Sequence, residues 1–114
     1  MSKILESRIE MVKLAKQWRY WAKRIAEGAK EILGECKVYV FGSVAEGQAT
    51  GGSDVDILIV SDRIPDRSRD RWELRAAIEE KAGLPLYHPY EIHLANTREA
   101  EWYFRFIKTK IVVE

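Results

Sequence analysis

The segment GSVAEGQATGGSDVD, residues 42–56, decides the fold because it joins two stretches of β-strand composition. Before it, residues 37–41 carry the β-branched and aromatic side chains that strands favour. After it, residues 55–60 form an apolar run that only one aspartate interrupts, as expected for a buried strand. The glycine-rich turn over residues 48–53 brings the end of the segment back to Ser43. The two ends of the segment are therefore predicted to lie together.

Two carboxylates stand at the head of the second strand. Side chains alternate between the faces of a strand, so Asp54 and Asp56 point one way while Val55 and Ile57 point the other. Two neighbouring anions resist ionising together unless a cation lies between them. Oxygen ligands suit magnesium, which takes its remaining ligands from water and substrate phosphates. Asp54 and Asp56 are therefore candidate metal ligands.

The other end of the segment is a candidate phosphate-binding loop. Gly42 follows a strand and lets the backbone approach a ligand closely. The backbone N–H and the hydroxyl of Ser43 can donate to phosphate oxygens, helped by any short helix that starts in residues 44–46. Phosphate at one end and metal at the other predict a nucleotide site. The alternative is a plain Gly-Ser loop followed by two solvated turn aspartates.

Gly-Ser, ten intervening residues and Asp-x-Asp in an apolar strand resemble the signature of the DNA polymerase β-like nucleotidyltransferase superfamily. The short chain is similar to the minimal nucleotidyltransferase branch of that superfamily, and the resemblance covers residues 37–95 and, more loosely, the flanking helices. It implies an α/β (α+β) fold of the polymerase β-like palm type. We expect a small mixed β-sheet of about three main strands, with helices on one face and the metal–nucleotide site on the other.

The strand predicted over residues 90–94 supplies the third candidate ligand. Its residues alternate strictly, so Glu91 and His93 share one face of the strand. The resemblance implies that Glu91 completes an acidic triad with Asp54 and Asp56. The alternative is that Glu91 lies on the wet face of a half-exposed sheet. His93 is interpreted as an ordinary polar-face histidine, with donation to a phosphate or support of Glu91 as the alternative.

Residues 3–33 are predicted to form one long helix, because apolar side chains recur at three- and four-residue steps and no proline interrupts them. Gly34 is expected to end this helix. The first turns of so long a helix are expected to project from the domain or to break. Its basic polar face is either an ordinary solvated helix surface or a site for nucleic acid or an acidic partner.

The rest of the chain predicts two further helices within one domain, residues 1–114. Residues 67–82 form the first, and the second begins with a capping box at Asn96. The catalytic core is expected over residues 37–95, followed by the C-terminal helix and tail over residues 96–114. The end of the tail either adds a short strand or frays.

Composition narrows the class of protein. Nineteen basic residues against eighteen acidic ones leave a net charge of +1, which argues against a general nucleic-acid binder. The single cysteine, Cys36, is unable to form an internal disulfide. No run approaches the length of a membrane span and the amino terminus lacks a signal-peptide core, so a cytoplasmic protein is expected.

The resulting hypothesis is a magnesium-dependent nucleotidyltransferase. Asp54, Asp56 and Glu91 would bind two Mg²⁺ ions, while Gly42 and Ser43 would hold the β- and γ-phosphates of ATP or another nucleoside triphosphate. Glu91 would favour loss of the proton from an incoming hydroxyl, which attacks the α-phosphorus. AMP is the expected transferred group.

The acceptor is left open by the sequence. Resemblance to antitoxins of toxin–antitoxin systems implies a tyrosine of a HEPN-domain partner protein, and other relatives modify small molecules. A rival hypothesis is a non-catalytic module that neutralises its partner by binding alone. Neutral charge and aromatic helices favour a protein acceptor over RNA, and homo- or hetero-oligomers are both compatible with the sequence. Many relatives have basic residues after Gly-Ser, whereas this chain has Val44 and Glu46.

Overall fold

The computed structural model describes residues 2–50 and 52–114, and these form four helices and one four-stranded sheet. Gly51, in the predicted glycine-rich turn, lies outside the described residues. The elements in chain order are α1 (Lys3–Lys16), α2 (Trp18–Leu33), β1 (Lys37–Phe41), β2 (Val55–Val60), α3 (Ser68–Ala82), β3 (Tyr90–Ala95), α4 (Thr97–Phe106) and β4 (Lys110–Val113).

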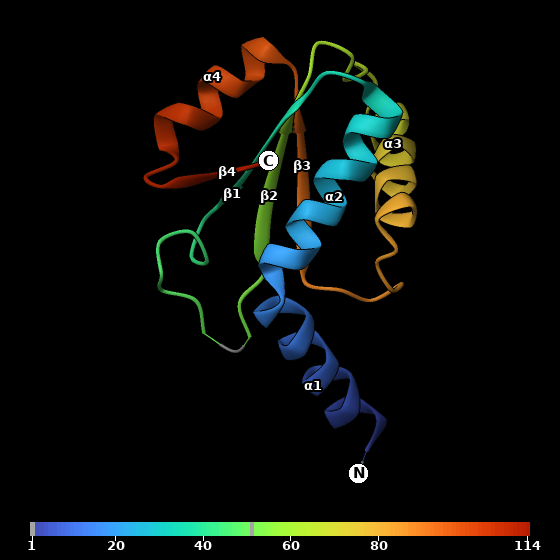
Figure 1. Cartoon of the computed structure of the whole chain (residues 1–114), viewed down its shortest axis with the longest axis vertical. Helices are drawn as coiled ribbons and strands as arrows, with labels where there is room; N and C mark the ends of the chain where they lie inside the picture. The colour runs from blue at the N-terminus through green and yellow to red at the C-terminus, as the bar shows by residue number, and fades with distance from the viewer. Residues whose placement is uncertain (1, 51) are drawn as a thin grey trace.

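The sheet is mixed, and its strand order is β3-β2-β1-β4 (Figure 1). Strand β1 is antiparallel to both β2 and β4, whereas β2 and β3 are parallel. The tail therefore adds a fourth strand to the three that the sequence predicts. The register places Phe41 opposite Asp56 and Asp56 opposite Glu91, so one row of the sheet crosses three strands.

The main core lies between the sheet and the helices α2 and α3. It is built from the β-branched and leucine side chains that alternate along the strands, and Ile57 and Ile59 of β2 are fully buried in it. The two helices approach each other closely at Gly28, where an added Cβ would lie 3.3 Å from the Cβ of Lys81. The small residue thus allows α2 and α3 to share the same face of a narrow sheet.

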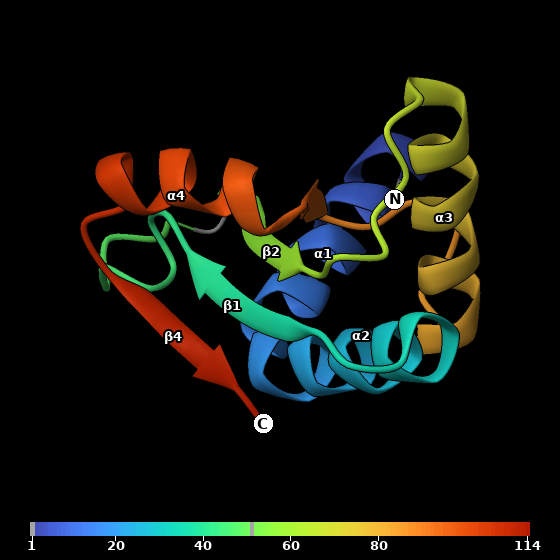
Figure 2. The same ribbon diagram turned by 90° about the horizontal axis from the view of Figure 1, so that it is seen from above.

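Helix α4 covers the opposite face, which corrects the expectation that all helices pack on one side. Figure 2 shows α4 and α2 on opposite sides of the sheet. Ala100 of α4 packs against Tyr39, Leu58 and Ala95 in a second, smaller core. The physical reason is that these three strand residues are apolar on a face that α2 and α3 do not reach, so a second layer is needed to bury them.

The predicted helix over residues 3–33 is broken at Gln17 into α1 and α2. Gln17 has φ −89° and ψ 27°, outside the helical range, although its N–H still donates to the Lys13 carbonyl. Near this break the Tyr90 hydroxyl donates to the Leu14 carbonyl at 2.5 Å. Helix α1 projects beyond the body of the molecule (Figure 1).

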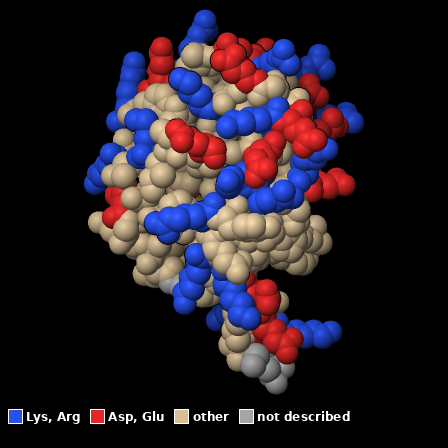
Figure 3. Space-filling view, viewed as in Figure 1, with Lys and Arg blue, Asp and Glu red and all other residues tan. Residues whose placement is uncertain are grey.

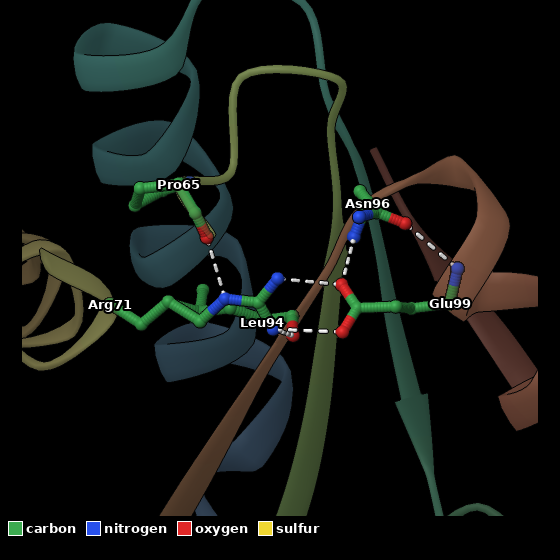
Figure 4. A network of polar contacts seen from close by, with 5 residues as sticks. All are labelled: Pro65, Arg71, Leu94, Asn96 and Glu99. Carbon is green, nitrogen blue, oxygen red and sulfur yellow. Dashed lines mark hydrogen bonds and ion pairs between the residues drawn. The ribbon is translucent and has the colours of Figure 1, made fainter. Parts of the chain in front are cut away.

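Arg71 of α3 ties α4 to the rest of the fold (Figure 4). Its guanidinium makes a bidentate ion pair with Glu99, at 2.7 and 3.0 Å, and donates to the Pro65 carbonyl at 2.6 Å. Glu99 also accepts the Asn96 N–H, while the Asn96 side chain accepts the Glu99 N–H, which confirms the predicted capping box. The start of α4 is thereby held at the end of β3.

The edge of β3 is protected by two arginines of α3. Arg75 donates to the Ile92 carbonyl at 2.8 Å and Arg71 to the Leu94 carbonyl at 3.4 Å. Both carbonyls belong to an edge strand, whose unpaired groups would otherwise face solvent or a second strand.

No helix within the described residues is long and apolar enough to cross a membrane.

Candidate active site

Asp56, Glu91 and His93 meet on the face of the sheet that carries α4. The parallel pairing of β2 with β3 puts Asp56 beside Glu91, and the alternation of β3 returns His93 to the same face. The His93 Nε2 atom lies 3.3 Å from Asp56 Oδ1, and one ligand atom from each of the three residues lies within 4.8 Å of the others. Two carboxylates and an imidazole thus converge at one end of the sheet.

Asp54 lies just before β2 and is exposed, so it stands beside this cluster rather than within it. Its charge is nevertheless close enough to raise the pKa of Glu91. The structure therefore brings Asp56 and Glu91 directly together and leaves Asp54 at the margin. His93, which the sequence analysis treated as an ordinary polar residue, occupies the third ligand position.

The pKa of Glu91 is raised above its ordinary value. Loss of solvent around the carboxyl group is the largest cause, followed by a hydrogen bond with Asp56 and by the charges of Asp56 and Asp54. The neighbouring His93 acts on the Glu91 pKa in the opposite direction. A site that holds its carboxylates this close together favours either a shared proton or a bound cation.

Gly42 connects the end of β1 to this cluster. It adopts φ +76°, a left-handed conformation that glycine tolerates and side-chain-bearing residues disfavour. A Cβ at this position would collide with the Asp56 carboxylate. A glycine therefore suits both the backbone turn and the carboxylate that lies against it.

The loop after Gly42 is a series of hydrogen-bonded turns rather than the short helix considered from the sequence. Glu46 N–H donates to the Gly42 carbonyl at 3.1 Å, and Gln48 N–H donates to the Ser43 carbonyl at 2.9 Å. Among the described residues, the N–H groups of Ser43 and Val44 have no protein acceptor. Both residues directly follow Gly42, which lies against the Asp56 carboxylate, so their N–H groups are available to a ligand bound at this loop.

Aromatic rings enclose the histidine of the cluster. His93 packs against Phe41 with ring centroids 5.2 Å apart and against Tyr103 of α4 at 5.9 Å. The contact with Tyr103 explains why α4 matters to the site, and sequence reasoning missed it because the packing of α4 on this face was not foreseen. The strict alternation of Glu91 and His93 was the one signal that marked His93.

The profile of the nucleotidyltransferase domain family matches residues 22–112, which include Gly42, the acidic cluster and most of the fold. The chain belongs to this family. Enzymes of the family use a nucleoside triphosphate and a divalent metal ion, and the acidic cluster agrees with that chemistry. The chain is thus a nucleotidyltransferase domain, and a transferase is its expected activity class.

Two solved structures are similar to this nucleotidyltransferase domain. A crystal structure of a protein provisionally assigned as a nucleotidyltransferase is 32% identical, covers 81% of this chain and 96% of its own, and superposes with a TM-score of 0.65. A second such protein, from Sulfolobus solfataricus, is 25% identical, covers 98% of this chain and 86% of its own, and has a TM-score of 0.60. No match was found among the curated proteins.

The residues present fit a divalent cation. Asp56 and Glu91 offer hard carboxylate oxygens, and His93 offers a neutral imidazole nitrogen when its pairing with Asp56 is released. Oxygen ligands suit magnesium, while the nitrogen would also accept manganese or zinc. The donor set therefore supports a metal-dependent transferase.

Proposed function

We propose that this nucleotidyltransferase domain transfers a nucleoside monophosphate, AMP from ATP, to a hydroxyl group, with two Mg²⁺ ions as cofactors. The observation that carries the proposal is the contact of Gly42 with the Asp56 carboxylate, which sets a loop with free N–H groups against the acidic cluster. A triphosphate on the loop would have its α-phosphorus at the carboxylates. That arrangement is what nucleotidyl transfer requires.

Each residue of the site has a part in the proposed reaction. Ser43 would bind the β- and γ-phosphates through its backbone N–H and hydroxyl, with Gly42 allowing their close approach. Asp54, Asp56 and Glu91 would hold the metal ions, which stabilise the charge that develops on the attacking and leaving oxygens. The raised pKa of Glu91 suits a group that accepts the proton of the attacking hydroxyl. His93 would orient Asp56 through its 3.3 Å contact.

A protein acceptor is favoured by an apolar groove at the same end of the sheet as the cluster. The groove, of about 470 Å³, lies between α1 and the loop that leads into β3. Leu86 and Tyr87 on one wall are 87% and 80% exposed, and Ile4 of the neighbouring helix is 71% exposed. Large exposed apolar side chains near a site are typical of protein interaction surfaces.

The partner we propose is a HEPN-domain protein with an acceptor tyrosine, as in the antitoxins that the sequence resembles. Nucleic acid is a less suitable acceptor, because the chain has a net charge of only +1, and basic and acidic side chains are interspersed on the face of the molecule seen in Figure 3. The cytoplasmic location of the protein, like its toxin–antitoxin role, remains a prediction.

The proposal is tested by incubating the protein with α-labelled ATP, Mg²⁺ and a HEPN-domain partner. We expect label on the partner, and loss of that label when Mg²⁺ is chelated. Asp56→Asn should also lose the label, and its matched control is Asp70→Asn, which should transfer label normally because Asp70 is an exposed aspartate in the first turn of α3. Tight binding without label would instead support a module that acts by binding alone. Label on a hydroxylated small molecule but not on the partner would reassign the acceptor.

A further inference from the structure

We propose that the groove between α4 and the loop after β1 holds the nucleobase of the donor nucleotide, with Trp102 and Phe106 as its stacking surface. This inference rests on the proposed function, because it assigns a subsite for the same donor. The groove has a volume of about 220 Å³. Its lining residues come from both elements: Phe41, Gly42, Glu46, Trp102, Tyr103, Phe106, Ile107 and Lys108.

The groove starts at the site and ends at exposed rings. Gly42, which touches the Asp56 carboxylate, forms one of its walls. Trp102 and Phe106 lie one helical turn apart on α4, with ring centroids 4.9 Å apart, and they are 57% and 68% exposed. A planar group that extends from the carboxylates along the groove would therefore meet two aromatic rings.

The exposed rings of Trp102 and Phe106 form an apolar surface that a bound ligand would bury. Helix α4 buries Ala100 against the sheet, and Tyr103 contacts the rings of Phe41 and His93, so the helix already has its packing face. Trp102 and Phe106 lie outside that packing and leave large apolar areas in water. Base–aromatic stacking is tolerant of sequence and removes such area from solvent.

The direction of the reaction assigns the groove to the donor rather than to the acceptor. In-line displacement requires the attacking hydroxyl to approach the α-phosphorus from the side opposite to the leaving pyrophosphate. With the β- and γ-phosphates on the loop after β1, the hydroxyl must come from the side of β3, where Glu91 lies. The groove borders Gly42 at the end of β1. It is therefore on the donor's side of the site.

The groove also accounts for the acid that follows the Gly-Ser pair. Glu46 lines the groove together with Lys108, so one group of each charge faces the ligand. A carboxylate in this place accepts hydrogen bonds from an exocyclic amino group of a base. Glu46 thus faces the base rather than the triphosphate.

The test separates binding of the base from binding of the phosphates. ATP and inorganic tripolyphosphate are titrated into the protein in the presence of Mg²⁺, with calorimetry as the readout. Trp102→Ala combined with Phe106→Ala should weaken ATP binding by about tenfold and leave tripolyphosphate binding unchanged. Trp102→Phe, which keeps a ring, should restore most of the affinity when Phe106 is present. The matched control is Trp72→Ala, because Trp72 is 67% exposed on α3 and should not affect either ligand.

The inference and the proposed function fail in different ways. Equal ATP affinity of the double variant and the unaltered protein, with transfer intact, would overturn the inference alone. A weaker apparent affinity for the acceptor with ATP affinity unchanged would also overturn it, because the groove would then serve the acceptor. ATP binding that depends on Trp102 and Phe106, in a protein that transfers no label, would support the inference and overturn the proposed function. Absence of ATP binding by the unaltered protein would overturn both.

Discussion

The two faces of β2 show how one short strand serves both the core and the site. On one face, Val55, Ile57 and Ile59 are fully buried under α2 and α3. On the other face, Leu58 is equally buried under α4, but Asp56, two residues earlier, keeps 24% of its side chain exposed. The difference is therefore one of cover: the first face is covered along its whole length and the second only in part.

The partial cover follows from the short connection between β3 and α4. Asn96, directly after β3, already caps α4, so the helix begins at the carboxyl end of the parallel pair. The amino ends of β2 and β3 stay open, and there the antiparallel β1 delivers its loop. In open parallel sheets ligands bind at the carboxyl ends of strands. Here the antiparallel neighbour moves the site to the amino ends.

The largest expected effect tests the open face. Asp56→Asn should reduce metal-dependent transfer by more than roughly a hundredfold. Loss of a residue that only hydrogen-bonds to a metal ligand costs up to about that much, and Asp56 is proposed as a ligand itself. The free energy of unfolding should change little, because the amide removes one charge from a group of neighbouring acids. The measurements are initial rates of label transfer and urea unfolding. Near-normal transfer would show that Asp56 holds no metal ion.

The second prediction tests whether the buried side chains on both faces of β2 contribute equally to the hydrophobic core. Ile57→Ala and Leu58→Ala should each lower the free energy of unfolding by about 2–5 kcal/mol, because each side chain is fully buried. Urea unfolding compares the two variants. A much smaller loss for Leu58→Ala would mean that α4 packs loosely and that the second face is open along its whole length.

The third prediction concerns the contact that joins the loop to the open face. Gly42→Ala should lower the free energy of unfolding by about 1–3 kcal/mol, through its positive φ and the collision with Asp56. Gly47→Ala is the matched control, because Gly47 has φ +71° and no atom within 4 Å of an added Cβ. The excess loss in Gly42→Ala measures the collision. Equal losses in the two variants would show that the Asp56 carboxylate can move away freely.

Sequence reasoning reached the elements whose signals are local. Alternation along residues 90–94 predicted β3, and the Asn96 capping box predicted the start of α4; both are confirmed. The nucleotidyltransferase family followed from the spacing of Gly42-Ser43 and Asp54-x-Asp56, and it is confirmed as well. These features depend on neighbouring residues or on one short loop, so a single chain without a structure is enough to find them.

The features that the sequence did not predict depend on contacts between distant elements. A break or a projection of the long helix was expected, but its position at Gln17 was not, and close to it the Tyr90 hydroxyl, more than seventy residues along the chain, donates to the Leu14 carbonyl. Arg71 resembles any solvated helix charge until Glu99 and the β3 carbonyls are placed beside it. Likewise, His93 became a candidate ligand only because pairing of β3 with β2 sets it next to Asp56. The assignment of the site residues themselves stays a prediction.

The smallest expected effect concerns the ion pair that keeps α4 on its part of the second face. Arg71 holds the pKa of Glu99 below its ordinary value, so the pair stabilises the fold above the unfolded-state carboxyl pKa of about 4.3 and loses that contribution as the pH falls toward the folded value. The Glu99 side chain is 41% exposed, so water screens the pair and its contribution at neutral pH should be at most about 1 kcal/mol. Glu99→Gln should therefore lower the free energy of unfolding at about pH 7 and approach the unaltered protein at about pH 3, as measured by urea unfolding. A deficit that is the same at both pH values would show that Glu99 holds α4 over Leu58 through the cap at Asn96 rather than through its charge.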